Sequence, residues 1–230
     1  ILGDSHMVAS SKHGYQAQTL AQNYKNKGYN VVWDGDTAAG TFCKGGKGVD
    51  YFLNTLSALK DAKPDIIIVG AIGGNDVLEA NKSAKKMAEY QEKYTKFFRK
   101  LKEISKASKV NLPNGALSVV VNGMPPASVP PKTKNYQDQR RELNEKIAKA
   151  AVQAGVQYNN IMHDWPVLDT PHYTKDGVHY NGSAMHTGEA NLFYKHLLKQ
   201  SGMSLPNAKQ ADQAALGPTT IGECGLTAGV

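Results

Sequence analysis

The stretch Pro64-Asp65-Ile66-Ile67-Ile68-Val69-Gly70 decides the fold. Its β-branched residues lie between a proline and a glycine, which is typical of a short strand. Apolar and polar residues do not alternate along this run. Both faces of the strand are therefore expected to be covered, as in a parallel sheet with a layer of helices on each side.

Similar apolar runs recur along the chain, and helical patterns separate them. The other expected strands are Ile1–Leu2, Val31–Trp33, Leu117–Val121 and Val156–Met162. The expected helices are Tyr15–Lys27, Val49–Asp61, Ala80–Ser108, Tyr136–Ala154 and Ala184–Gln200. This alternation predicts an α/β protein, a three-layer α/β/α sandwich around a mostly parallel five-stranded sheet.

The long helix combines an apolar stripe with a basic surface. Its stripe recurs at three and four residues, through Met87, Tyr90, Tyr94, Phe97, Leu101 and Ile104. Residues 82–109 contain ten Lys or Arg and three Glu, in a chain of net charge +7. The surplus indicates either a solvated helix face or a surface that attracts a polyanionic glycan. Nucleic acid is not an expected partner, because no recognised binding motif accompanies the basic stretch.

The chain of 230 residues is long enough for one sizeable core. Residues 1–202 are expected to form one domain, and residues 203–230, rich in small and polar residues, a linker or tail that leads to another module. No run is long and apolar enough for a membrane span, and Ile1 already belongs to the first strand, as in a piece of a longer chain. A disulfide between Cys43 and Cys224 is an open alternative.

Polar loops follow the expected strands at one edge of the sheet. Ser5 follows the first strand, Gly35 the second and Asn75 the third. Asp176 and His179 lie in the long loop after the fifth strand. Ligands of doubly wound sheets bind beyond the carboxyl ends of the strands, so these residues are expected to converge there.

A serine, a histidine and an aspartate at one edge indicate nucleophilic catalysis. A serine hydroxyl is a poor nucleophile until a histidine takes its proton, and a carboxylate holds that histidine in the required tautomer. Ser5 is the candidate nucleophile, His179 the general base and acid, and Asp176 the residue that orients His179.

The chain resembles the SGNH (GDSL-type) hydrolases in three ordered blocks. Gly3-Asp4-Ser5 matches the first block, Gly73-Gly74-Asn75-Asp76 the third and Asp176-Gly177-Val178-His179 the fifth. The single glycine of the second block fits Gly35 best, with Gly40 as the alternative. His6 departs from the family pattern, which often has Leu there. The resemblance covers roughly residues 1–200.

The resemblance implies an oxyanion hole built from the backbone N–H groups of Ser5 and Gly35 and the side-chain amide of Asn75. Asp4 and Asp76 are expected to brace their own turns by local hydrogen bonds. No cofactor and no metal are expected, because the histidines match no compact ligand pattern. The run Gly45-Gly46-Lys47-Gly48 lacks the spacing of a phosphate-binding loop.

Together these patterns predict a serine esterase that hydrolyses acyl esters, above all acetyl esters. The expected substrate is an acylated polysaccharide or cell-wall glycan, or a small ester. A lipid esterase, a thioesterase and an acyltransferase with the same residues are the alternatives among enzymes. A glycan-binding module without turnover is the alternative from another class. The location in the cell is not fixed by the sequence; the basic surface and the signs of a longer parent chain favour an extracytoplasmic or virion-associated protein.

Overall fold

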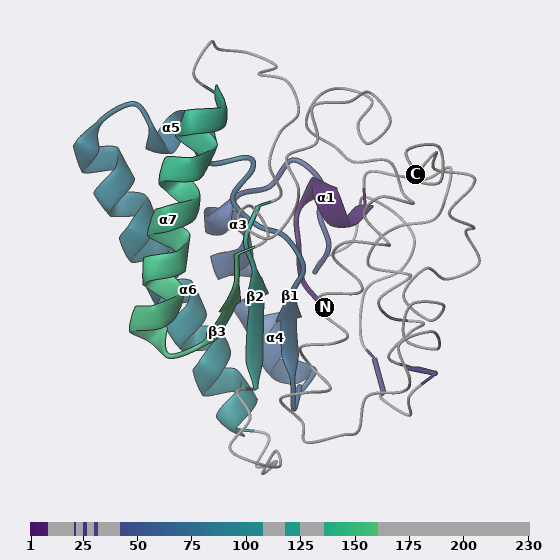
Figure 1. Ribbon diagram of the computed structural model, residues 1–230. Helices are drawn as coiled ribbons and strands as arrows, with labels where there is room; N and C mark the ends of the chain where they lie inside the picture. The colour runs from purple at the N-terminus through teal and green to yellow at the C-terminus, as the bar shows by residue number, and fades with distance from the viewer. Residues whose placement is uncertain are drawn as a thin grey trace, which may run out of the picture.

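A computed structural model describes residues 1–8, 21, 25–26, 30–31, 42–107, 118–124 and 136–160 (Figure 1). Three strands form its sheet, β1 (Ile67–Val69), β2 (Val119–Asn122) and β3 (Gln157–Asn159). They are all parallel and lie in the order β1-β2-β3, with Ile68 opposite Val120 and Val121 opposite Tyr158. Parallel strands are thereby confirmed in the segments predicted at Asp65–Gly70, Leu117–Val121 and Val156–Met162, of which Leu117, Ile161 and Met162 lie outside the described residues.

The first residues of the chain extend this sheet on its other edge. Leu2 pairs with Val69, and Gly3 pairs with Cys43, both in parallel. Five parallel backbone segments therefore lie side by side. Their order across the sheet is the segment at Cys43, the segment Leu2–Gly3, β1, β2 and β3. This order reverses direction between the segment Leu2–Gly3 and β1, which is the switch point at which doubly wound sheets bind ligands.

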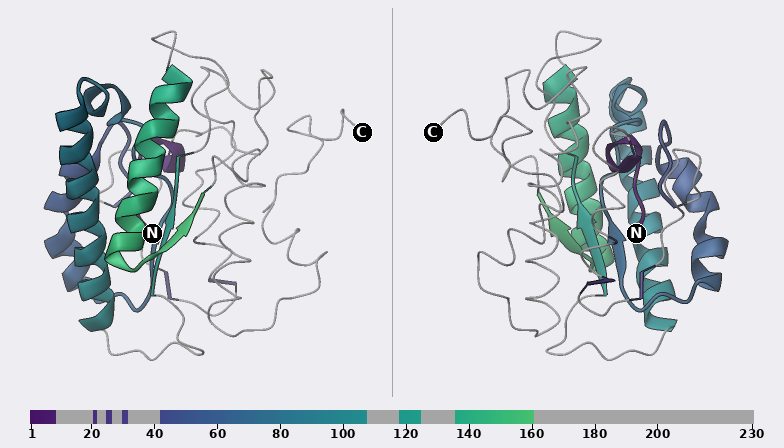
Figure 2. Two further views of the ribbon diagram at one scale, coloured as in Figure 1. Left: turned by 60° about the vertical axis from the view of Figure 1, so that its left-hand side comes forward. Right: turned by 90° about the vertical axis from the view of Figure 1, so that its right-hand side faces the viewer.

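Helices cover one face of the sheet. The long helices are α6 (Ala84–Ala107) and α7 (Tyr136–Ala154), which lie side by side in both views of Figure 2. The shorter helices of this layer are α3 (Val49–Asn54), α4 (Leu56–Asp61) and α5 (Val77–Ala80). The single turn α1 (Ser5–Val8) lies apart from them, across the strands from α6 and α7 in Figure 1. The contacts of α6 with α3, α4 and α7 make one continuous layer. The helices predicted at Tyr15–Lys27 and Ala184–Gln200 lie almost wholly outside the described residues, as does the 203–230 tail.

The predicted stripe of α6 forms much of the core. Met87, Tyr90, Tyr94, Phe97 and Leu101 are buried, and Ile104 packs against them half-buried. The ring of Phe97 lies 6.3 Å from that of Phe52 and 5.7 Å from that of Phe98. Burying such side chains is the main stabilising contribution to the layer, at about 1.5–3 kcal/mol for each.

Two predicted helices are interrupted in the structure. The segment Val49–Asp61 breaks at Thr55, whose hydroxyl donates to the carbonyl of Phe52 at 2.8 Å. The helix predicted from Ala80 begins only at Ala84 as α6, and Ala80 is instead the last residue of α5. Ser83 starts α6 as its cap, because its hydroxyl oxygen accepts a hydrogen bond from the Lys86 N–H at 3.1 Å.

Much of the basic surface is paired with carboxylates. Lys86 bonds Glu89, Lys100 bonds Glu103, Lys93 reaches Asp50 on α3, and Lys82 pairs with Glu79. Exposed pairs of this kind contribute little to stability, but they reduce the local positive charge. Within the described part of the chain, no helix has the length and hydropathy needed to cross a membrane.

The side chain of Met7 fills a socket between two backbones. A Cβ atom on Gly3 would overlap Met7 Cγ, and one on Gly70 would overlap the sulfur and methyl of the same side chain. Met7 is fully buried. The glycine of the Gly3-Asp4-Ser5 turn is therefore required by packing, because α1 lies directly on the sheet through Met7.

We expect Gly3→Ala to destabilise the protein by about 1–3 kcal/mol, because the added methyl overpacks this socket. Met7→Ala is expected to cost about 2–5 kcal/mol through the cavity that it leaves. In the double variant the methyl enters that cavity. The double variant should therefore lose at least about 0.5 kcal/mol less unfolding free energy than the sum of the two single losses. Urea unfolding of the four proteins measures this coupling, and strictly additive losses would contradict the socket.

Candidate active site

The Ser5 turn leaves the sheet at the switch point. The Leu2 N–H donates to the Ile68 carbonyl at 2.8 Å, and the Gly70 N–H donates to the Leu2 carbonyl at 2.7 Å. Immediately beyond, the Asp4 N–H donates to the Ala71 carbonyl at 2.9 Å. Ser5 follows as the half-buried first residue of α1. Backbone hydrogen bonds alone thus fix where the candidate nucleophile lies relative to the end of β1.

The second turn of the site follows β1. Gly73 has a φ of +111°, which favours glycine, and a Cβ there would press against Ile147 Cδ1 at 2.6 Å. The Asp76 N–H closes the turn on the Gly73 carbonyl at 3.0 Å. Asn75 is exposed at its tip. The Gly73–Asp76 turn therefore presents the Asn75 amide at the same edge as Ser5.

A third segment, the glycine loop Gly45–Gly48, lies at the same edge and contacts the Gly73–Asp76 turn. It follows Phe42–Lys44, which pairs with Gly3 through two hydrogen bonds of 3.0 Å: the Gly3 N–H donates to the Phe42 carbonyl, and the Lys44 N–H donates to the Gly3 carbonyl. Asn75 Nδ2 donates to the carbonyl of Lys47 within the loop at 3.0 Å. The glycine loop therefore lies against Asn75, beside the strand that carries Ser5.

The Asp76 carboxylate ties this loop to the core. Its Oδ2 accepts from the Val49 N–H at 2.9 Å and from the Tyr94 hydroxyl at 2.5 Å. Burial raises the pKa of Asp76, while those two hydrogen bonds lower it and the nearby charge of Asp4 raises it. Burial also holds the pKa of Tyr94 well above its usual value, so this hydroxyl stays a donor. The expectation that Asp76 makes only local hydrogen bonds is therefore wrong, because both partners belong to other elements.

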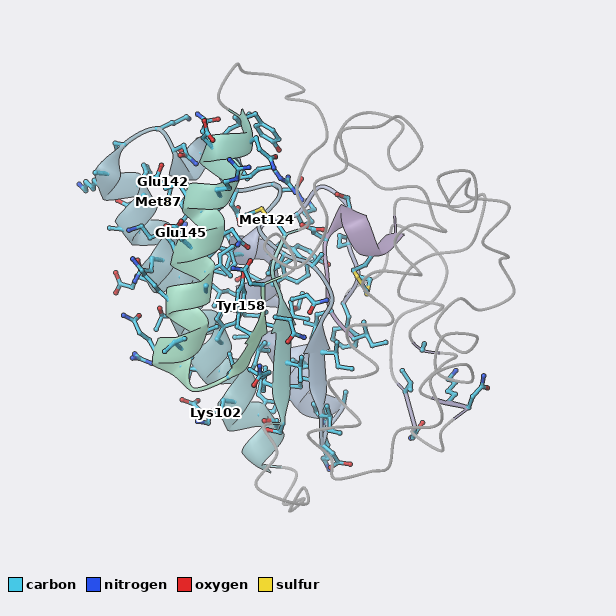
Figure 3. The ribbon with its side chains drawn as sticks, in the orientation of Figure 1. Met87, Lys102, Met124, Glu142, Glu145 and Tyr158 are labelled. Carbon is cyan, nitrogen blue, oxygen red and sulfur yellow. The ribbon has the colours of Figure 1, made fainter. Side chains whose placement is uncertain are left out.

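A group of buried or half-buried amides lies at the carboxyl ends of β2 and β3. Asn159 Nδ2 donates to Asn122 Oδ1 at 3.1 Å, and the Tyr158 hydroxyl donates to Asn144 Oδ1 at 2.6 Å. Figure 3 shows Tyr158 reaching from β3 toward α7. Asn144 Nδ2 in turn donates to Asn160 Oδ1 at 3.1 Å. This network fixes the exits of the two strands next to the site.

The described residues contain part of the predicted site. Ser5 and Asn75 are brought to one edge, on the turns that follow neighbouring strands. Asp176, His179, Gly35 and Gly40 lie outside the described residues, as does Cys224. Among the residues that the structure describes, no group of three or more His, Cys, Asp or Glu side chains is placed to hold a metal ion.

Sequence reasoning considered the glycine loop only as a phosphate-binding loop and set it aside. The signal for its true place was the apolar Phe42-Cys43 pair directly before it and the helical pattern directly after it. Together they mark a strand, a turn and a helix, the same order that brings Ser5 and Asn75 to this edge.

Comparisons with known proteins agree with this arrangement. Residues 1–186 match the model of the GDSL-like lipase/acylhydrolase family. No curated protein matches the chain. Among solved structures, a GDSL-like lipase from Bacteroides thetaiotaomicron is similar with a TM-score of 0.58 and 21% identity, over 86% of each chain.

The acetylxylan esterase Axe2 from Geobacillus stearothermophilus is similar with a TM-score of 0.56 and 16% identity, over 88% of this chain and 93% of that one. The α/β hydrolase LAE5, from the metagenome of Lake Arreo in Spain, has the same TM-score of 0.56 and 16% identity, over 87% and 93%. These structures share the α/β fold with this chain. With the family match over residues 1–186, the chain belongs to the GDSL-like lipase/acylhydrolase family and is a hydrolase of ester bonds.

Proposed function

We propose that the chain is a serine esterase that forms a covalent acyl-enzyme on Ser5. The observation that carries this proposal is the pairing of two turns at the switch point of the sheet. The Ser5 turn and the Gly73–Asp76 turn leave neighbouring strands, and the Asp4 N–H donates at 2.9 Å to the carbonyl of Ala71, two residues before the second turn. A nucleophile and an oxyanion donor are thereby held at one edge by rigid elements.

In the first half-reaction Ser5 Oγ bonds to the acyl carbon while His179 takes the hydroxyl proton. The electron pair of the carbonyl moves onto its oxygen. When this intermediate collapses, the C=O bond re-forms, the bond to the alcohol oxygen breaks, and His179 gives its proton to that oxygen. Asp176 orients the imidazole throughout.

In the second half-reaction water takes the place of the alcohol. His179 accepts a proton from water as its oxygen bonds to the acyl carbon, and the same collapse releases the acid and returns the proton to Ser5 Oγ. No redox partner or additional group is needed, because every proton that His179 accepts is given back within the cycle.

Negative charge on the acyl oxygen is the feature that the site must stabilise. The donors are the Ser5 N–H, the Asn75 amide and a glycine N–H, which sequence reasoning assigns to Gly35 or Gly40. An amide nitrogen carries two N–H groups, so Asn75 can hold the Lys47 carbonyl with one and the oxyanion with the other. Its exposure leaves the amide accessible to substrate.

We propose an acetylated polysaccharide as the substrate. Acetylxylan esterases are prominent among the solved structures that share the fold, which supports a small acyl group on a bulky carrier. An exposed Asn75 agrees with a site that a polymer can approach, since a large carrier needs an unobstructed edge.

Ser5→Ala should abolish labelling by a fluorophosphonate probe and lower ester hydrolysis by at least about a thousandfold, because no other group can carry the acyl chain. His179→Ala should slow labelling for lack of a base. Ser57→Ala, at an exposed position of α4, is the matched control and should label normally. Absence of a Ser5 adduct in the folded wild-type protein would favour the glycan-binding alternative.

Asn75→Ala should reduce kcat by about a hundredfold to a thousandfold through the loss of one oxyanion donor. Asn75→Asp should lose as much, because a carboxylate cannot donate. Asn54→Ala, which removes an exposed amide at the end of α3, is the control. Turnover close to that of the wild type in Asn75→Ala would remove Asn75 from the oxyanion hole.

Acetate release from acetylated xylan and other O-acetylated glycans should exceed that from long-chain acyl esters at equal ester concentration. The readout is kcat/KM for each substrate, with p-nitrophenyl acetate and p-nitrophenyl palmitate as references. A clear preference for palmitoyl over acetyl esters would overturn the glycan proposal in favour of a lipid esterase.

A further inference from the structure

The glycine loop Gly45–Gly48 has no role in the chemistry described so far, although it borders the site. It begins where Phe42–Lys44 leaves the sheet beside Gly3, and it ends at Val49, the first residue of α3. Within it, Gly46 has a φ of +70° and open space around its Cβ position. The loop is thus a sharp turn of nearly bare backbone at the edge that carries Ser5.

Three contacts attach this loop to the Gly73–Asp76 turn. Asn75 Nδ2 donates to the Lys47 carbonyl at 3.0 Å, and the Val49 N–H donates to Asp76 Oδ2 at 2.9 Å. The third is steric, since a Cβ on Gly48 would overlap the Asp76 carboxylate. The loop can therefore approach this closely only with glycine at position 48.

The Asp76 carboxylate is itself held from the core. The Tyr94 hydroxyl on α6 donates to the same Oδ2 at 2.5 Å, and both side chains are buried. Although Asp76 precedes α5, its side chain does not cap that helix. The carboxylate thus links a core helix to the N–H of Val49, the residue at which the glycine loop ends.

The ionised carboxylate of Asp76 lowers the stability of the folded chain. Burial raises the pKa of Asp76, so the ionised form is less favourable in the folded chain than in the unfolded chain. That cost is present above the folded pKa and disappears below the unfolded pKa. An apolar side chain would avoid that cost, but it would leave the Val49 N–H and the Tyr94 hydroxyl without this acceptor, so the carboxylate is the group that holds both donors in place.

We propose that Asp76 is a positioning residue: it holds the glycine loop against Asn75, so that the Asn75 amide is fixed in place as an oxyanion donor. The inference rests on the proposed function. It goes beyond that function because it names a residue outside the oxyanion hole that keeps one of its donors in place. Asp76 acts through Val49 and Tyr94 and does not contact substrate.

Three variants of Asp76 and Tyr94 test this role. Asp76→Ala removes both hydrogen bonds and should lower kcat for p-nitrophenyl acetate by about tenfold to a hundredfold with little change in KM, because a donor displaced by about 1 Å loses that much. Asp76→Asn keeps the shape and an oxygen acceptor and should restore kcat to within about threefold of the wild type. Tyr94→Phe removes one support and should give an intermediate loss.

Tyr90→Phe is the matched control on the same helix, since Lys93 Nζ lies 4.7 Å from the centroid of the Tyr90 ring and the described residues show no hydrogen bond from Tyr90 to the loop. It should leave kcat unchanged. Amide hydrogen exchange gives a readout independent of activity: the Val49 N–H should lose protection in Asp76→Ala and keep it in Asp76→Asn. Fluorophosphonate labelling of Ser5 in the wild type reports on the proposed function separately.

Wild-type kcat in folded Asp76→Ala overturns the positioning role while the serine mechanism stands. Equal losses in Asp76→Ala and Asp76→Asn overturn it too, because charge and not geometry would then matter. If Asp76→Ala does not fold, Tyr94→Phe decides, and a kcat equal to that of Tyr90→Phe counts against the proposal. Failure of Ser5 to label overturns the proposed function and this inference together.

Discussion

Everything at the site depends on the two-sided hydrogen bonding of the first residues of the chain. Leu2 bonds Ile68 and Gly70 on one side, and Gly3 bonds Phe42 and Lys44 on the other. A strand held on both sides cannot slide, because a shift by one residue would exchange its two sets of partners. Ser5 comes two residues after Gly3, so its place at the edge that carries the Asn75 turn and the glycine loop is a consequence of backbone pairing.

Sequence reasoning was most successful where periodicity is long and unbroken. The helix predicted at Tyr136–Ala154 is α7 with the same bounds, and the apolar stripe of α6 is buried as expected. It failed where a single side chain ends a helix. The breaks at Thr55 and before Ser83 depend on hydroxyl groups that bond the backbone, and such bonds compete with helix continuation without altering the apolar pattern.

At the site, the polar residues themselves can be predicted from the sequence more readily than their hydrogen-bond partners. Ser5 and Asn75 could be placed at one edge, because each follows a recognisable strand. The bonds from Asp76 to Val49 and Tyr94 could not be predicted, since they join segments separated by 27 and 18 residues along the chain. Such contacts exist only after α3 and α6 have packed together, so they are a property of the tertiary structure.

The socket of Met7 has an evolutionary consequence. Gly3 and Gly70 lie on neighbouring backbones, and a single thioether side chain occupies the space that both would need for a Cβ. These three positions share one volume, so a change at one of them alters what the other two tolerate. In lineages that descend from this chain, these three positions should change together, because a methyl gained at either glycine requires a shorter side chain at position 7. The glycine of the Gly-Asp-Ser turn is therefore constrained by a packing residue outside that turn.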